Sequence, residues 1–123
     1  MSKKDNIIIV LILIAICYID GELKVKTPTV TGNVAKGHAT PTGVDPVNYK
    51  QRNAVLRGPG YSSPFKYWVP FNGGIGLHDA DWRTSFGGDI YKTNGSHGCI
   101  NLPPNIAGQV YDLVYPGMPV VVY

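Results

Sequence analysis

Cysteine and charged residues are scarce in this chain of 123 residues. It has two cysteines, Cys17 and Cys99, so at most one disulfide bond can form, which argues against a disulfide-stabilised scaffold. Charged residues make up 15% of the chain, and eleven Lys and Arg against eight Asp and Glu leave a formal net charge of +3. No basic run resembles a nucleic-acid footprint, so we do not expect nucleic acid as a partner.

Long apolar and repetitive segments are missing as well. Residues 7–19 form the longest mainly apolar run, which would measure about 20 Å as a helix and falls short of the ~30 Å hydrocarbon core of a membrane. A comfortable membrane span is therefore not expected, although association with a membrane through these residues stays open. Glycine has no three-residue period and 44% of residues are hydrophobic, which excludes collagen-like and disordered chains.

The first twenty residues permit two interpretations. A charged start before the apolar run of residues 7–17 is the pattern of a secretory signal. Asp20-Gly21 instead has the composition of a two-residue hairpin turn, and the residues before that turn would then form the first strand of the domain. We divide the chain into residues 1–17, a signal-like segment or first strand, and residues 18–123, the main domain.

The remaining composition favours a mainly β fold, because 15 glycines, 10 prolines and eight tyrosines suit short strands joined by many turns. Loops are expected at residues 37–46 and 79–95, with a turn at Arg57-Gly58-Pro59-Gly60. A single helix is predicted from apolar residues at helical spacing and is expected to begin at Asn101 or Pro103-Pro104. The periodic residues are Ile106, Val110, Leu113 and Val114. Strands are expected within residues 23–32, 49–56, 66–71, 75–78 and 120–123.

The segment Ser96-His97-Gly98-Cys99-Ile100-Asn101 carries the clearest chemical signal. A cysteine between a glycine and the start of a helix is well placed for nucleophilic work, because backbone N–H groups and a helix N-terminus favour a thiolate. An ordinary cysteine is mostly protonated at neutral pH and needs a base. Among His38, His78 and His97, the best candidate is His78, which ends a predicted strand 21 residues before Cys99.

Two motifs together resemble the L,D-transpeptidase (YkuD-type) catalytic domain family. Ile75-Gly76-Leu77-His78-Asp79 followed by the Ser96–Asn101 segment resembles the signature of that family, and the resemblance covers roughly Tyr18 to Tyr123. Val30-Thr31-Gly32 with Ala39–Gly43 is similar to an earlier segment of the family. The resemblance implies a β-sandwich or barrel with one short helix after the cysteine turn.

The resemblance also implies a role for each matching residue. Cys99 corresponds to the nucleophile that forms a thioester, and His78 to the histidine that takes the thiol proton. Ser96 corresponds to a position that orients this histidine in some members, a role that a backbone carbonyl takes in others, here that of Asp79. The backbone N–H groups of His97, Gly98 and Cys99 would form the oxyanion hole, and the substrate groove would include Asn101, Trp82 and Asp79.

The family's reaction supplies the expected substrates. The donor is a peptidoglycan stem tetrapeptide, the acceptor is an amine of a neighbouring stem, and the product is a 3→3 cross-link that serves cell-wall biogenesis and cell shape. No metal or organic cofactor is expected, because thiolate, imidazole and oxyanion hole suffice for acyl transfer. Carbapenem-type inhibitors are expected to acylate the cysteine. The expected location is extracytoplasmic, at the cell wall or cell surface of a bacterium.

Other functions remain open at this stage. Water in place of the amine would give an L,D-carboxypeptidase from the same acyl-enzyme, and a domain shortened at its N-terminus would be an inactive wall-binding module. A zinc site would use His78, His97 and Cys99 with His38 or Asp79. Zinc is disfavoured because a single residue separates His97 from Cys99, whereas two to four are usual.

Structural roles compete with the functional ones at several positions. Ser96 has the composition of a turn or helix cap, and Trp82 suits the hydrophobic core. Asp79, Asp81 and Asp89 are expected as solvated loop charges.

Overall fold

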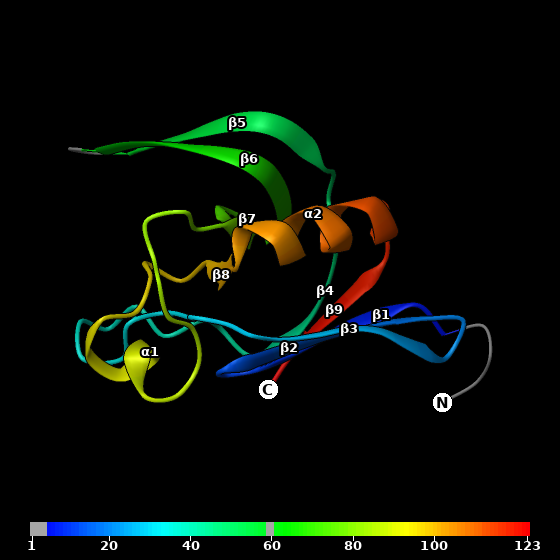
Figure 1. Ribbon diagram of the computed structural model, residues 1–123, viewed down its shortest axis with the longest axis horizontal. Helices are drawn as coiled ribbons and strands as arrows, with labels where there is room; N and C mark the ends of the chain where they lie inside the picture. The colour runs from blue at the N-terminus through cyan, green and yellow to red at the C-terminus, as the bar shows by residue number, and fades with distance from the viewer. Residues whose placement is uncertain (1–4, 59–60) are drawn as a thin grey trace.

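Two β-sheets make up most of the molecule in a computed structural model that describes residues 5–58 and 61–123. One sheet has five strands in the order β3-β2-β1-β9-β4, and the other has four in the order β5-β6-β7-β8. Figure 1 shows the five-stranded sheet as one layer, with α2 and the four-stranded sheet above it. This arrangement confirms the predicted mainly β fold. The strands are β1 (Ile7–Leu11), β2 (Ile14–Ile19), β3 (Glu22–Pro28), β4 (Gly43–Pro46), β5 (Gln51–Gly58), β6 (Tyr61–Asn72), β7 (Ile75–Asp79), β8 (Ile100–Leu102) and β9 (Pro119–Val122).

The apolar N-terminal run folds into a hairpin. β1 and β2 pair in antiparallel register from Ile7 with Tyr18 to Leu11 with Ile14, and β1 also pairs in parallel with β9. β1 is therefore the middle strand of the five-stranded sheet. β2 includes residues on both sides of the boundary between residues 17 and 18 that was drawn from the sequence. No helix in the described part of the chain is long and apolar enough to span a membrane.

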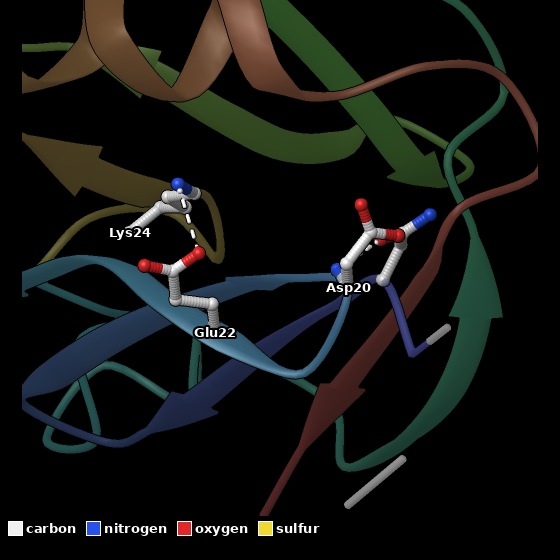
Figure 2. Close-up of polar contacts among 4 residues, drawn as sticks. Asp20, Glu22 and Lys24 are labelled. Atoms are coloured by element: carbon white, nitrogen blue, oxygen red, sulfur yellow. Dashed lines mark hydrogen bonds and ion pairs between the residues drawn. The ribbon is translucent and has the colours of Figure 1, made fainter. Parts of the chain in front are cut away.

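The predicted turn at Asp20-Gly21 is confirmed. Ile19 pairs with Glu22, and both turn residues have positive φ, 54° and 75°, as a two-residue hairpin of this kind requires. The Asp20 N–H donates to Asn6 Oδ1 at 2.7 Å, which ties the turn to the start of the chain. Figure 2 shows Asp20 in this turn, with the Glu22–Lys24 ion pair of 3.3 Å on the exposed side of β3.

The four-stranded sheet places the predicted His78 strand at its centre. β7 pairs with β6 on one side, where His78 lies opposite Trp68, and in parallel with β8 on the other, where His78 lies opposite Asn101. β5 and β6 form a long twisted hairpin along the top of the view in Figure 1. The turn predicted at residues 57–60 lies partly outside the described residues.

Helix α2 (Pro104–Leu113) confirms the predicted helix and its proline start, and it ends one residue before Val114. Ala107 and Val110 face the core, which also receives side chains from both sheets. Burial of this aliphatic cluster between the layers is the main source of stability for a domain of this size.

Three short elements were not predicted from the sequence. A second helix, α1 (Ile90–Thr93), lies in the expected loop at residues 79–95, so the prediction of a single helix is wrong. The expected loop at residues 37–46 ends in β4, whose residues are mostly exposed and show no alternation, because pairing with β9 rather than burial defines this edge strand. β8 has only three residues, and pairing with β7 defines it.

Candidate active site

The segment that contains Cys99 is held in place by a second extended segment of the chain. Val30 exchanges two backbone hydrogen bonds with Asn101, of 3.1 and 2.8 Å. The Ser96 N–H donates to the Thr31 carbonyl at 2.9 Å, and the Asn33 N–H donates to the Ser96 carbonyl at 2.8 Å. A Cβ atom on Gly95 would lie 2.6 Å from the Thr31 carbonyl oxygen, so only glycine allows this close approach.

Hydrogen bonds within the turn before Cys99 fix its shape. Ser96 Oγ donates to the Cys99 carbonyl oxygen at 2.5 Å and accepts the Gly98 N–H at 3.1 Å. Thr40 Oγ1 donates to the Gly98 carbonyl oxygen at 2.7 Å and accepts the Gly32 N–H at 3.0 Å. Gly98 has a φ of +126°, a conformation that side chains disfavour. The backbone around Cys99 is therefore preorganised.

His78 is the buried titratable group of the site, with 4% of its surface exposed. Its ring stacks on Phe65, with centroids 3.7 Å apart and planes 18° apart. Its Nδ1 lies 2.7 Å from the Asp79 backbone carbonyl oxygen. Because a carbonyl oxygen only accepts hydrogen bonds, Nδ1 carries a proton, and in the neutral ring Nε2 holds the free lone pair.

The side chains of Asn101 and Arg83 extend the contacts of the site beyond His78 Nε2. Asn101, 1% exposed, has its Nδ2 3.3 Å from His78 Nε2. Arg83 donates from Nε to Asn101 Oδ1 at 2.9 Å and from Nη1 to the Asn94 carbonyl at 2.9 Å. The buried polar groups on this side of the four-stranded sheet therefore form one connected chain of hydrogen bonds.

His78 and Cys99 open into the same cleft, which has a volume of about 360 Å³. Cys99 Sγ lies 3.6 Å from the Gly74 carbonyl oxygen, and Trp82, 55% exposed, forms part of the wall. The cleft is lined by Leu56, Ser63, Phe65, Gly74, His78, Trp82, Arg83, Gly95, Ser96, His97, Cys99 and Asn101.

Burial shifts the pKa of both central groups toward the neutral form. Desolvation lowers the pKa of His78 to about 4, against a smaller opposing effect of the hydrogen bond to the Asp79 carbonyl. Desolvation also raises the pKa of the Cys99 thiol, and the Gly76 backbone opposes this in part. Burial therefore disfavours the thiolate of Cys99 and the imidazolium of His78.

Six of the residues singled out from the sequence line the cleft, namely His78, Trp82, Ser96, His97, Cys99 and Asn101. The hydroxyl of Ser96 bonds within the turn, and the contact to His78 Nδ1 comes from the Asp79 carbonyl. The expectation of Asp79 as a solvated charge is wrong, because its side chain is buried and accepts the Tyr67 N–H at 3.0 Å. Trp82 is 55% exposed, so the alternative role in the hydrophobic core that its residue type suggested is also wrong.

Phe65 and Arg83 line the cleft although the sequence did not single them out. Neither belongs to a motif near Cys99 or His78, and β-sheet pairing and a long loop bring them to the cleft. His38 packs its ring 5.2 Å from that of His97 but does not line the cleft. Within the described residues, no three His, Cys, Asp or Glu side chains gather closely enough to hold a metal ion.

Comparison with protein families and solved structures supports one relationship. Residues 9–122 match the model of the YkuD family, described as the L,D-transpeptidase catalytic domain. The comparison with curated proteins found no match.

Solved structures of L,D-transpeptidases have the same fold. The crystal structure of a Cys-to-Ser mutant of the Enterococcus faecium enzyme superposes with a TM-score of 0.91 at 38% identity, over 97% of this chain and 50% of that one. The NMR structure of the catalytic domain of the Enterococcus faecium enzyme acylated by ertapenem gives a TM-score of 0.85 at 39% identity, over 100% and 98% of the two chains. The crystal structure of an enzyme from Mycobacterium tuberculosis H37Rv gives a TM-score of 0.84 at 26% identity, over 96% of this chain and 57% of that one. The chain thus spans about half the length of the Enterococcus faecium crystal structure.

Proposed function

Because this chain belongs to the YkuD family of L,D-transpeptidase catalytic domains, we propose that it is a cysteine-dependent L,D-transpeptidase that forms 3→3 peptidoglycan cross-links. One observation carries the proposal: Cys99 and His78 line a single cleft, and the hydrogen bond from His78 Nδ1 to the Asp79 carbonyl leaves Nε2 as the unprotonated ring nitrogen. Two relatives of known structure are a carbamoyl enzyme of avibactam and an acyl-enzyme of ertapenem, which supports covalent chemistry in this fold.

The acylation step uses Cys99 as nucleophile and His78 as base. The Cys99 thiol gives its proton to His78 Nε2 as the sulfur bonds to the carbonyl carbon of the third residue of a stem tetrapeptide. In this proposal backbone N–H groups of the turn at His97 and Cys99 stabilise the oxyanion, whereas the Gly98 N–H already donates to Ser96 Oγ at 3.1 Å. Removal of one such donor in other enzymes typically costs about 2.7–4 kcal/mol of barrier. The C–N bond to the terminal D-alanine then breaks, and the departing amine takes the proton from His78.

The second step transfers the acyl group to an amine. The acceptor amine of a neighbouring stem attacks the thioester carbonyl and gives a proton to His78, and the Cys99 sulfur leaves and is reprotonated by His78. The side chains available in the cleft suffice for this sequence, so no cofactor is proposed. We place the reaction outside the cytoplasmic membrane, at the cell wall, because the proposed substrate lies there.

Ser96 has a positioning role in this proposal. Its hydroxyl bridges the Gly98 N–H and the Cys99 carbonyl, which fixes the turn that presents the oxyanion donors. Asp79 orients His78 through its backbone carbonyl, and its carboxylate holds β6 through the Tyr67 N–H. Trp82 forms an exposed wall of the cleft, where a peptide would pack.

The test is intact-protein mass spectrometry after incubation with ertapenem. We expect one adduct per molecule for the wild type and for Cys17→Ala, and none for Cys99→Ala. Cys17 is the matched control because it is buried in β2, outside the cleft. An adduct that persists in Cys99→Ala, or a folded wild type that gives no adduct, would contradict the assignment.

A second assay distinguishes transfer from hydrolysis. The enzyme is incubated with a stem tetrapeptide, with and without a stem that carries an acceptor amine. A cross-linked dimer with release of D-alanine supports the transpeptidase. Formation of tripeptide alone in both samples would replace it with an L,D-carboxypeptidase.

A further inference from the structure

Arg83 lies in the loop after β7 and makes two directed hydrogen bonds inside the site. Its Nε donates to Asn101 Oδ1 at 2.9 Å, and its Nη1 donates to the Asn94 carbonyl oxygen at 2.9 Å. The second bond anchors the guanidinium to the segment that precedes the cysteine turn. The hydrogen bond to the Asn94 carbonyl therefore helps to fix the position of Nε relative to Asn101.

The arginine determines which end of the Asn101 amide faces His78. A guanidinium has only donors, so the atom of Asn101 opposite Arg83 Nε has to be the oxygen. The amide nitrogen then faces His78 Nε2, 3.3 Å away. The reversed amide would place its N–H groups against the donor of Arg83 and leave that half-buried donor without its partner, which is unfavourable.

The orientation of the amide decides the favoured protonation state of the imidazole. An N–H that faces Nε2 pairs with the lone pair of the neutral ring and opposes a proton at that nitrogen. An oxygen in the same place would accept a hydrogen bond from a protonated Nε2. With the Asp79 carbonyl already at Nδ1, that oxygen would complete a pair of acceptors suited to imidazolium.

We propose that Arg83 is a positioning residue that, through the Asn101 amide, holds the resting His78 ring in the neutral tautomer whose Nε2 is unprotonated. The base role of His78 belongs to the proposed function, on which this inference rests. The orientation of the amide and the titration of His78 are nevertheless properties of the free protein and are measurable without any reaction.

Burial is the largest cause of the lowered pKa of His78, and the groups around the ring add smaller effects. The carboxylate of Asp79 favours the charged ring and the guanidinium of Arg83 opposes it, while Cys99 and His97 line the same cleft. From β6, the ring is faced by Phe65 and Trp68, neither of which titrates.

The experiment follows the ¹⁵N-labelled imidazole of His78 by NMR across pH in the full chain. Arg83→Met keeps the aliphatic stem and removes the donors, so we expect the pKa of His78 to rise from about 4 by about one unit or more. Arg83→Lys is the matched control, because a lysine ammonium also has only donors and should keep the titration near that of the wild type. An unchanged titration in Arg83→Met would overturn the proposal.

A second measurement separates orientation from charge. Nuclear Overhauser contacts between the Asn101 amide protons and the His78 ring protons are expected in the wild type and in Arg83→Lys, and they should weaken in Arg83→Met. A shifted titration in Arg83→Met with these contacts unchanged would overturn the proposal in favour of a simple charge effect. The wild-type contacts alone also test the orientation if Arg83→Met does not fold, since their absence at neutral pH would contradict it.

The acylation rate links the inference to function. With ertapenem, the wild-type rate should fall as the pH drops through about 4, and in Arg83→Met this fall should move upward together with the titration of His78. If the acylation rate falls at the same pH in Arg83→Met as in the wild type while the pKa of His78 rises, the link from Arg83 to the base would be overturned. A wild type that is not acylated at any pH would contradict the proposed function and leave the NMR result standing.

Discussion

The two cysteines of this protein lie in different chemical surroundings, one in each half of the fold. Cys17, in β2 of the five-stranded sheet, is 2% exposed and sits among aliphatic side chains that include Ile8, Val25 and Leu77. Cys99 lies just before β8 of the four-stranded sheet, where a cleft, an imidazole and a preorganised turn meet. The same residue type is therefore a core side chain in one place and a candidate nucleophile in the other.

The comparison shows that burial by itself does not make a thiol reactive. Desolvation raises the pKa of Cys17 to about 11 and also raises that of Cys99, so burial disfavours the thiolate in both places. The difference lies in the neighbours: β7 brings His78 to the cleft that Cys99 lines, whereas aliphatic side chains surround Cys17. A base and access to the solvent distinguish the proposed site from the core.

The largest expected effect comes from removal of the base. His78→Ala should slow acylation of Cys99 by ertapenem about 10²–10⁴-fold, because a neutral thiol then has no partner to take its proton. Stopped-flow fluorescence or timed mass spectrometry measures the rate, and circular dichroism verifies the fold. Near-normal acylation of a folded His78→Ala protein would remove the proposed contrast between the two cysteines.

The pH dependence of stability should separate the two halves of the molecule. Between pH 6.5 and about 4 the unfolded chain binds a proton at His78 that the folded chain does not, so the free energy of unfolding should fall with falling pH by up to roughly 3 kcal/mol. Between pH 9.0 and about 11 the unfolded chain releases the Cys17 proton that the folded chain keeps, so stability should fall with rising pH by a similar amount. The Cys99 thiol acts in the same direction at high pH.

Urea unfolding at a series of pH values measures both losses of stability. The loss below pH 6.5 is the acidic limb, and the loss above pH 9.0 is the alkaline limb. His78→Gln should flatten the acidic limb and leave the alkaline one, while Cys17→Ala should reduce the alkaline limb and leave the acidic one. Loss of both limbs in either variant would contradict this assignment.

Local signals in the sequence explain which parts of the fold were predictable. Asp20-Gly21 combines two residues that tolerate positive φ, and Pro104 with the apolar spacing of α2 marks a helix start. β7 consists mostly of residues that are buried and ends next to the polar loop, so this strand could also be predicted from the sequence. In each case the residue types that form the element also mark its ends.

The turn that divides the apolar run into β1 and β2 has no such signal. Ile12 and Leu13 occupy it, with Ile12 at a φ of +35°, which a β-branched residue disfavours. Distant groups hold it in place: Thr31 Oγ1 donates to the Ile12 carbonyl at 2.7 Å, and the Thr29 N–H donates to the Leu13 carbonyl at 2.8 Å. Long-range contacts of this kind cannot be predicted from local composition.

The same distinction applies to the candidate site. Cys99 and His78 were indicated by residue type and by motif, since nucleophile and base are chemically distinctive. Arg83 and Phe65 are ordinary residues whose place in the cleft depends on a loop path and on strand pairing. Asn101 was assigned to the substrate groove from the sequence and does line the cleft, but its contacts to His78 and Arg83 could not be predicted from the sequence.

The smallest expected effect concerns the core cysteine. Cys17→Ala should lower the free energy of unfolding by only about 1 kcal/mol, because one sulfur atom leaves a small gap in the aliphatic cluster. Cys17→Ser should cost more, about 1–3 kcal/mol, since a buried hydroxyl among aliphatic side chains lacks a hydrogen-bond partner. Both variants should be acylated at the wild-type rate. Slower acylation of a stably folded Cys17→Ala protein would mean that packing in the five-stranded sheet controls the geometry of the cleft, and the two halves would no longer be separable.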